Sequence, residues 1–460
     1  MTVQPSLHLN LFIYPSGHHA AAWRHPSTRP ERLFDAEYYV ELAQRAEAAR
    51  FDSVFFADWP ALGSPEHTSA GTLDPILTLA AIASRTERVG LVATASTTYG
   101  DPYTLARSFA SLDHLSNGRA GWNVVTTSAP DAAGNFGLAA HPDPEVRYAR
   151  ADEVLTAVTR LWDSWDEDAI LLDRESGRYA DPARIHPAAF VGEHVRVAGA
   201  LTVPRTPQGR PVLVQAGASN TGRAFAARWA EAIFTAHQRI EDAQAFYADV
   251  KRSVLREGRD PARVAILPGI SPVIGSTEEE ARSLEKEIDD LVVLGAAAAQ
   301  LGSFHVDLGS LDLDDPVPLE AFADAGTVTD NRASRLQVVA DIVRRERPTV
   351  RELLRRLAGA RGHRVVVGTP VQVADTIEEW FRSGAADGFN VMPPLLPSGF
   401  EVFADEVVPI LQRRGLFRTE YEGSTLREHL GLEVPDARAE RAERAESAAP
   451  AGRPTPEDVR

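Results

Sequence analysis

The chain has 460 residues, of which 65 are acidic and 48 are basic, so its formal net charge is −17. This charge argues against nucleic acid or an anionic membrane as the main partner, because both carry negative charge themselves. The absence of cysteine excludes thiol catalysis, disulfides and cysteine-based zinc sites. We find neither a signal peptide nor an apolar run of about 18 residues, so a cytoplasmic protein is expected.

Strand-like and helix-like patterns alternate along most of the chain. Short apolar runs predict strands at 7–14, 53–57, 89–96, 120–126, 212–216, 232–235, 264–274 and 388–392. Helical spacing of apolar residues predicts helices at 36–50, 75–84, 103–115, 147–162, 221–229, 241–256 and 371–383. This alternation indicates an α/β fold, namely a TIM-like (β/α)8 barrel, with an open doubly wound sheet as the structural alternative.

Three segments interrupt the alternation. Residues 163–210 are rich in proline and charge, with some β structure expected near 194–197, and residues 278–361 mix helical stretches with an acidic loop. Insertions of this length commonly lie over the mouth of a barrel. Residues 435–460 repeat Ala, Arg and Glu before turning proline-rich, so we expect a disordered tail after a single barrel domain at 1–434.

Polar residues lie at the ends of the second, third and fourth predicted strands. Asp58 directly follows the second, Thr94 and Ser96 end the third, and Asn123 lies in the fourth. The carboxyl ends of barrel strands meet at one mouth, so these positions predict a ligand site there. Each residue also has a structural explanation: a turn or helix cap for Asp58, β-propensity for the hydroxyl residues, and a backbone contact for Asn123.

A candidate anion site follows the fifth predicted strand, where VLVQ runs into AGASNTGR and a helix. Free N–H groups at a helix start, with the Ser219 hydroxyl beside them, are suited to a phosphate. The motif is neither a Walker A loop nor a GxGxxG fingerprint, and a capped helix without a ligand is the alternative. Tyr148 begins another helix and either reaches this phosphate or packs with Ala151 and Leu155.

Four further residues, Trp23, His25, Trp59 and Tyr99, are candidates for lining a substrate pocket, although each is equally explained as a surface or core residue. The sequence contains no HExxH motif and no GxSxG elbow, and its histidines are scattered, so no metal site is expected. No catalytic acid, base or nucleophile stands out. That pattern is typical of an enzyme whose cofactor carries the reactive group.

Seven motifs, in order between residue 7 and about residue 432, together resemble the bacterial luciferase-like flavin-dependent monooxygenases. They include FFADWP at 55–60, NFG at 135–137 and RYARADE at 147–153, and the others lie at 18–26, 90–127, 211–234 and 389–432. Within that superfamily the chain is similar to the branch of nitrilotriacetate monooxygenase component A and dibenzothiophene sulfone monooxygenase.

The resemblance implies a barrel that binds FMN at the carboxyl ends of its strands. It implies that Asp58, Thr94 and Ser96 approach the isoalloxazine, with Asn123 nearby, and that the phosphate is held by Tyr148, Ala218 and Ser219. Two departures matter. Relatives often carry a histidine nearer the Arg-Tyr pair, where this chain has HPDPEV with His141, and they often have Ser-Ser-Pro where it has Ala-Ser-Asn.

The implied reaction uses FMNH2 supplied by a separate NAD(P)H-dependent flavin reductase. Reduced FMN reacts with O2 to a flavin C4a-(hydro)peroxide, which oxygenates a small organic substrate, often with C–N or C–S cleavage. The two insertions are candidates for shielding that species from water, and relatives commonly form homodimers or homotetramers. The functional alternatives are a deazaflavin-dependent oxidoreductase on the same barrel and a flavin-binding barrel without turnover.

Overall fold

The structure is a computed structural model that describes residues 6–62, 65–67, 69, 71–217, 219–295, 297–298, 308, 311–326, 331–360 and 362–448. Its parallel sheet closes on itself, because β1 pairs with both β2 and β13 and β10 pairs with β11. The barrel strands are β1 His8–Ile13, β2 Ser53–Phe56, β3 Gly90–Ser96, β4 Ala120–Val125, β9 Val212–Gln215, β10 Ala232–Thr235, β11 Ala265–Ile274 and β13 Gly388–Val391. Closure confirms the predicted barrel and rules out the open sheet.

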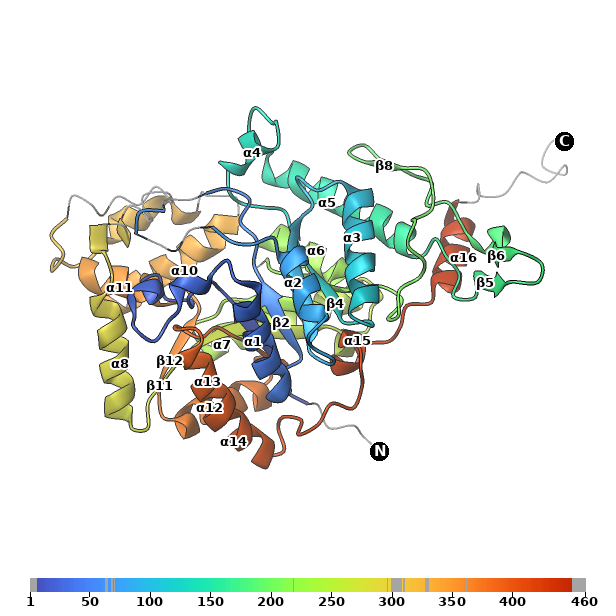
Figure 1. Cartoon of the computed structure of the whole chain (residues 1–460). Helices are drawn as coiled ribbons and strands as arrows, with labels where there is room; N and C mark the ends of the chain where they lie inside the picture. Colours follow the sequence, from blue (N-terminus) through green and yellow to red (C-terminus); the bar gives the residue numbers. More distant parts are fainter. Residues whose placement is uncertain are drawn as a thin grey trace.

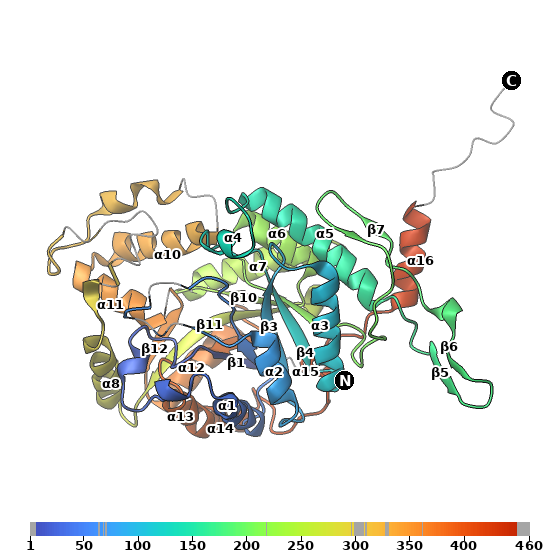
Figure 2. The same cartoon turned by 45° about the horizontal axis from the view of Figure 1, so that its top comes forward.

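Helices surround the barrel (Figures 1 and 2). The seven predicted ones are confirmed as α1 Ala36–Ala48, α2 Pro75–Ala83, α3 Pro102–Leu115, α5 Pro144–Trp162, α6 Asn220–Trp229, α7 Ile240–Arg256 and α12 Pro370–Arg382. Their starts follow from local chemistry. In α2 and α3 an aspartate cap, Asp74 or Asp101, accepts a backbone N–H of the first turn, and a proline follows at the first helical position.

The end of the barrel at which the strands begin is closed by α15 Leu426–His429, whose Leu426 is buried in the barrel centre. Gly90 and Gly121 make room for that side chain. A Cβ on Gly90 would lie 2.5 Å from one Leu426 methyl, and a Cβ on Gly121 would lie 3.1 Å from the other. A ligand must therefore enter from the opposite end, where the strands finish. Helices α13 Ser398–Val402 and α14 Val408–Arg413 pack outside the barrel before α15.

The second insertion lies against the mouth. It contains α8 Glu278–Asp290, α10 Asn331–Glu346 and α11 Val350–Ala360, which are followed by β12 Arg364–Gly368. The loop after β1 is joined to it, because the Ala20 N–H donates to Ala358 O at 2.8 Å and His19 Nε2 lies 3.1 Å from an Asp289 oxygen. Strand β12 was not predicted. It extends the sheet by pairing with the outer half of β11.

The first insertion forms two hairpins, β5 Ile170–Asp173 with β6 Arg178–Ala180 and β7 Phe190–Val191 with β8 Arg196–Val197. The β structure expected near 194–197 is thus present as β8. Glu153 of α5 accepts N–H groups of residues 193–195 at 2.7–3.0 Å, which fixes the turn between β7 and β8. The β5–β6 hairpin instead projects away from the barrel, since its strands pair only with each other (Figures 1 and 2).

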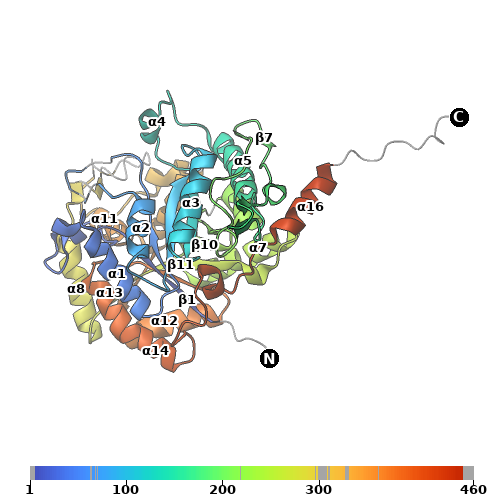
Figure 3. The same cartoon turned by 45° about the vertical axis from the view of Figure 1, so that its right-hand side comes forward.

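Within the C-terminal segment, where the sequence predicts disorder, the structure contains a helix, α16 Ala437–Ala448. It extends beside the first insertion (Figure 3). Glu440 forms an ion pair with Arg210 at 2.5 Å, and Arg441 pairs with Asp166. Composition does not reveal such tertiary ion pairs, so the sequence alone does not predict an ordered helix here. Residues 449–460 lie outside the described residues, and the predicted single domain at 1–434 stays a prediction.

Replacing Asp52 with asparagine should destabilise the fold. Asp52 is fully buried between His8 Nδ1 at 2.9 Å, the Leu9 N–H at 2.7 Å and the Arg418 guanidinium. Burial alone would raise the pKa of this carboxyl, but Arg418 and His8 outweigh burial and hold it below its usual value. Asp52→Asn removes the counter-ion of Arg418, whose side chain is only 12% exposed, so urea unfolding at pH 7 should show a loss of about 3 kcal/mol.

The pH dependence of that loss follows from the lowered pKa. The stabilisation is complete above the ordinary carboxyl pKa of about 4 and is lost as pH falls through the lower folded value. The difference in the free energy of unfolding between wild type and Asp52→Asn should therefore become smaller at acidic pH. Glu420→Gln, which removes an exposed partner of Arg50, is the control and should change stability by less than about 0.5 kcal/mol. Equal unfolding midpoints for Asp52→Asn and wild type would contradict the role of this ion pair.

Candidate active site

The barrel centre carries an aromatic cluster built from three strands. Phe12 of β1 and Phe55 of β2 stack with ring centroids 4.4 Å apart, and Phe234 of β10 meets them edge-on at 5.5 and 5.9 Å. His363 stacks on Phe234 at 5.0 Å with the two planes only 2° apart. We call Phe12, Phe55 and Phe234 the aromatic floor. The sequence did not predict it, although Phe55 lies within FFADWP, because local spacing does not show that these three distant strands meet.

Thr94 and Asn123 lie side by side on adjacent strands, since the β3–β4 register pairs them directly. Both are buried, and Asn123 Nδ2 donates to Thr94 Oγ1 at 2.8 Å. Among the described residues, Asn123 Oδ1 has no hydrogen-bond partner, and neither does the buried Gln215 Oε1 at the end of β9. A buried amide oxygen that accepts no hydrogen bond destabilises the fold. A ligand N–H that donates to Asn123 Oδ1 or Gln215 Oε1 would remove that destabilisation.

Ser96 is held where β3 ends. Its Oγ accepts from Thr127 Oγ1 at 2.7 Å and from the Tyr99 N–H at 3.4 Å. Thr127 lies in the loop after β4 with a positive φ of 49°. The hydroxyl proton of Ser96 is not used in either bond, so it can be donated to a ligand.

Asp58 lies two residues beyond β2 and is half-buried. Burial, together with the charge of Asp74, raises the pKa of its carboxyl. A raised pKa at a barrel mouth is a feature of functional carboxyls. The same loop is joined to the loop after β4, because Asn135 Nδ2 donates to Pro60 O at 3.0 Å.

Two hydroxyls converge at the start of α6. Ser219 is its N-cap, and its Oγ accepts the Gly222 N–H at 3.1 Å. Tyr148 of α5 packs on Phe225 at 5.7 Å, and its Oη would lie 3.0 Å from a Cβ placed on Gly222. The helix cap that the sequence offered as an alternative is thus present, and Tyr148 packs on Phe225 of α6, a partner that the helical spacing of α5 did not predict. The bond from the Gly222 N–H does not use the hydroxyl proton of Ser219. Ala218 lies outside the described residues.

The four substrate-pocket candidates lie on three loops. Trp23 and His25 follow β1; Trp23 Nε1 donates to His67 O at 3.1 Å, and His25 lies between Ser27 Oγ at 2.8 Å and Glu287 at 3.3 Å. Trp59 follows β2 and is 60% exposed. Two of the four contact another predicted site residue through their backbone N–H groups: Trp59 donates to the Asp58 carboxyl, and Tyr99 donates to Ser96 Oγ. The structure thus joins Tyr99 with Ser96, Thr94 with Asn123, and Tyr148 with the start of α6.

His237, in the loop after β10, is another residue that sequence reasoning missed. Burial lowers the pKa of its imidazole to about 4, and the ring lies 4.9 Å from Phe246. It is therefore neutral near pH 7. Within the described ranges no three His, Asp or Glu side chains are grouped to hold a metal ion, and no helix is long and apolar enough to cross a membrane.

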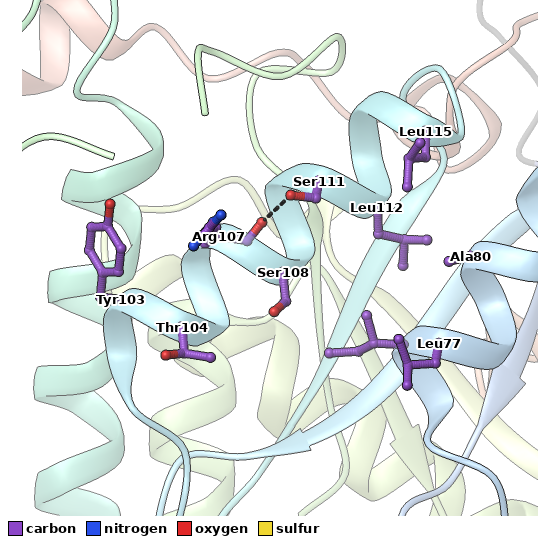
Figure 4. Close-up of a pocket in the computed structure, with 10 residues that line it drawn as sticks. Leu77, Ala80, Tyr103, Thr104, Arg107, Ser108, Ser111, Leu112 and Leu115 are labelled. Carbon is purple, nitrogen blue, oxygen red and sulfur yellow. Dashed lines mark hydrogen bonds between the residues drawn. The ribbon is translucent and has the colours of Figure 1, made fainter. Parts of the chain in front are cut away.

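A separate groove of about 350 Å³ runs between α2 and α3 on the outside of the barrel (Figure 4). Leu77 and Leu115, on its two helices, are mostly exposed. Arg107 and Tyr103 complete the α3 side. This groove lies on the helices and not at the strand ends, so it is distinct from the residues described above.

Comparison with known proteins agrees with this arrangement. Residues 12–387 match the family model of luciferase-like monooxygenases. The chain is 47% identical to N-acetyl-S-(2-succino)cysteine monooxygenase of Bacillus subtilis (strain 168), over 93% of this chain and 97% of the relative. It is 44% identical to nitrilotriacetate monooxygenase component A of Aminobacter aminovorans, over 95% and 98% of the two chains.

Among solved structures, riboflavin lyase with modified FMN and riboflavin superposes with a TM-score of 0.82 at 34% identity, covering 94% of this chain and 97% of the other. The resemblance based on motifs is therefore confirmed, including the branch that contains nitrilotriacetate monooxygenase component A. The chain belongs to the luciferase-like monooxygenase family and is a flavin-dependent monooxygenase.

Proposed function

We propose that this chain is the oxygenase component of a two-component system. It takes FMNH2 from a separate NAD(P)H-dependent reductase and uses O2 to oxygenate a small organic substrate, with the second oxygen atom leaving as water. The observation that carries this proposal is the Asn123 amide oxygen at the mouth, which is buried and has no hydrogen-bond partner among the described residues. The Ser219 hydroxyl at the start of α6 offers a second polar site on the same barrel.

The residues present fit a flavin at both ends. A planar heterocycle with N–H groups matches the Asn123 and Gln215 oxygens, and we place Asp58, Thr94 and Ser96 beside it. A phosphate matches the start of α6, where we place Tyr148, Ala218 and Ser219. When bound, reduced FMN would supply the two electrons that activate O2.

The chain's own contribution is binding, orientation and exclusion of water. The aromatic floor of Phe12, Phe55 and Phe234 is apolar, and α15 closes the barrel beneath it. The second insertion covers the loop after β1. Excluding water suppresses loss of the activated oxygen as hydrogen peroxide.

The substrate proposal rests on the names of the relatives. N-acetyl-S-(2-succino)cysteine and nitrilotriacetate suggest a small polar substrate whose C–S or C–N bond is cleaved after oxygenation. Trp23, His25, Trp59 and Tyr99 remain our candidates for its pocket. We also propose a cytoplasmic homodimer or homotetramer, for which the exposed apolar face of α2 and α3 is a suitable contact.

The proposal is tested by anaerobic titration with reduced FMN and with a reduced deazaflavin, followed by admission of O2 with a candidate substrate. We expect saturable binding of reduced FMN and substrate-dependent product. Binding of the deazaflavin alone would replace the proposal by the deazaflavin-dependent oxidoreductase. Reduced FMN binding with peroxide as the sole product across a broad substrate panel would favour a barrel without turnover.

Ser219→Ala should weaken the binding of reduced FMN about fivefold, the equivalent of ~1 kcal/mol for one hydrogen bond. The variant loses both the proposed phosphate contact and the cap to the Gly222 N–H. Ser219→Gly is the comparison, because glycine caps a helix almost as well as serine but also lacks the hydroxyl. Both variants should bind equally weakly, and wild-type affinity in Ser219→Gly would contradict the phosphate contact.

A further inference from the structure

One hydrogen-bonded pair at the mouth has no role in flavin binding as proposed above. The Tyr99 hydroxyl lies 2.7 Å from His141 Nδ1, and its ring stacks on Phe136 with centroids 4.4 Å apart and planes 10° from parallel. Tyr99 follows β3, whereas Phe136 and His141 follow β4. The loop after β4 therefore holds the Tyr99 side chain of the loop after β3 in two ways: Phe136 packs on the face of its ring, and His141 bonds its hydroxyl.

The backbone under Tyr99 is equally constrained. The Arg150 guanidinium donates to the carbonyls of Thr97, Thr98 and Gly100 at 3.0–3.2 Å. The Tyr99 N–H donates to Ser96 Oγ. So many contacts on a short loop fix the phenol oxygen before any substrate arrives, which is the property of a residue that must meet a reacting atom.

The pair has the groups that a proton relay needs. Burial raises the pKa of Tyr99, so the phenol keeps its proton. When Nδ1 of a neutral imidazole accepts that proton in a hydrogen bond, the phenol oxygen keeps lone pairs with which it can accept from a further donor. The donor that fits it is a hydroxyl newly placed on the substrate carbon.

We propose that Tyr99 contacts the oxygenated substrate and that His141, as its positioning residue, takes up the proton released when the substrate cleaves. The hydroxyl proton passes to the Tyr99 oxygen while the phenol proton passes to His141 Nδ1. The O–H electron pair forms the C=O bond. The C–S pair leaves with sulfur as a thiolate, or the C–N pair leaves with a nitrogen that is already protonated and departs as a neutral amine. This step consumes no oxidant, and it rests on the function proposed above.

The test uses the full chain, reduced FMN from a reductase, O2 and N-acetyl-S-(2-succino)cysteine as the probe. Tyr99→Phe, His141→Ala and His141→Gln should each lower kcat about tenfold or more, with KM and the FMNH2 dissociation constant within twofold of wild type. Gln keeps an acceptor for Tyr99 but takes no proton. Recovery of kcat in His141→Gln would therefore overturn the relay, as would unchanged kcat in all three variants.

Matched controls are Tyr103→Phe and His114→Gln, whose hydrogen bonds to Thr202 and to Pro204 O lie outside the mouth. They should keep wild-type kcat. Absence of product in wild type would count against the proposed function and not against the pair, which is tested without substrate by nitrogen-15 NMR. Tyr99→Phe should shift the His141 Nδ1 resonance, and an unshifted resonance overturns the pair.

Discussion

Replacing Gly222 with leucine should raise the dissociation constant of reduced FMN at least tenfold, or about 1.4 kcal/mol. A Cβ at this position would lie 3.0 Å from both Ser219 Oγ and Tyr148 Oη and 3.2 Å from the Gly217 carbonyl carbon. The rest of a leucine side chain would separate the two hydroxyls that we assign to the phosphate. Anaerobic fluorescence titration measures the effect.

The matched control for Gly222→Leu is Gly199→Leu. No atom lies within 4 Å of a Cβ built on Gly199, so the same substitution there should leave the affinity unchanged. Helix propensity does not confound the comparison, because leucine is a better helix former than glycine in α6. Wild-type affinity in a folded Gly222→Leu protein would show that the start of α6 does not hold the flavin.

Asp58→Ala should divert most of the O2 consumed from product to hydrogen peroxide, lowering the ratio of product to peroxide about tenfold. We place this carboxyl beside the flavin, where one lost charge-assisted hydrogen bond is typically worth about 1.5–3 kcal/mol. Asp58→Asn separates charge from shape, since it keeps an acceptor and loses the charge. Product and peroxide are measured together under limiting NADH.

A second variant tests Asp58 through its neighbour. Burial and the charge of Asp74 both raise the pKa of Asp58. Asp74→Asn removes that charge and still caps α2, because asparagine is an equally good N-cap. We call the ratio of product to hydrogen peroxide the coupling. The pH at which the coupling changes should therefore be lower in Asp74→Asn than in wild type. Unchanged coupling in Asp58→Ala, or an unmoved midpoint in Asp74→Asn, would contradict the assigned role.

The barrel could be predicted because its strands are short, apolar and separated by helices with clear starts. Strand β12, RVVVG, was not predicted although its valines favour a strand; it pairs with the outer half of β11 and is not one of the eight barrel strands. Helix α16 was missed because ion pairs to a distant insertion stabilise it. For α16, tertiary contacts outweighed the local signal.

The site was predicted one strand at a time. Thr94 and Asn123 could each be proposed from their strand, but the register that pairs them is a property of the sheet. The aromatic floor joins β1, β2 and β10, which are separated by up to 222 residues between Phe12 and Phe234. The pair of Tyr99 and His141 depends on how two loops meet. None of these contacts follows from local spacing.

The central claim is that the chain transfers one atom of O2 to an organic substrate at the expense of reduced FMN. The most direct test is turnover under ¹⁸O2 with FMNH2 supplied by a reductase and N-acetyl-S-(2-succino)cysteine or nitrilotriacetate as the substrate. We predict one ¹⁸O atom per molecule of oxygenated product and the other in water. Product that forms without ¹⁸O, or that forms equally in the absence of O2, would contradict the account.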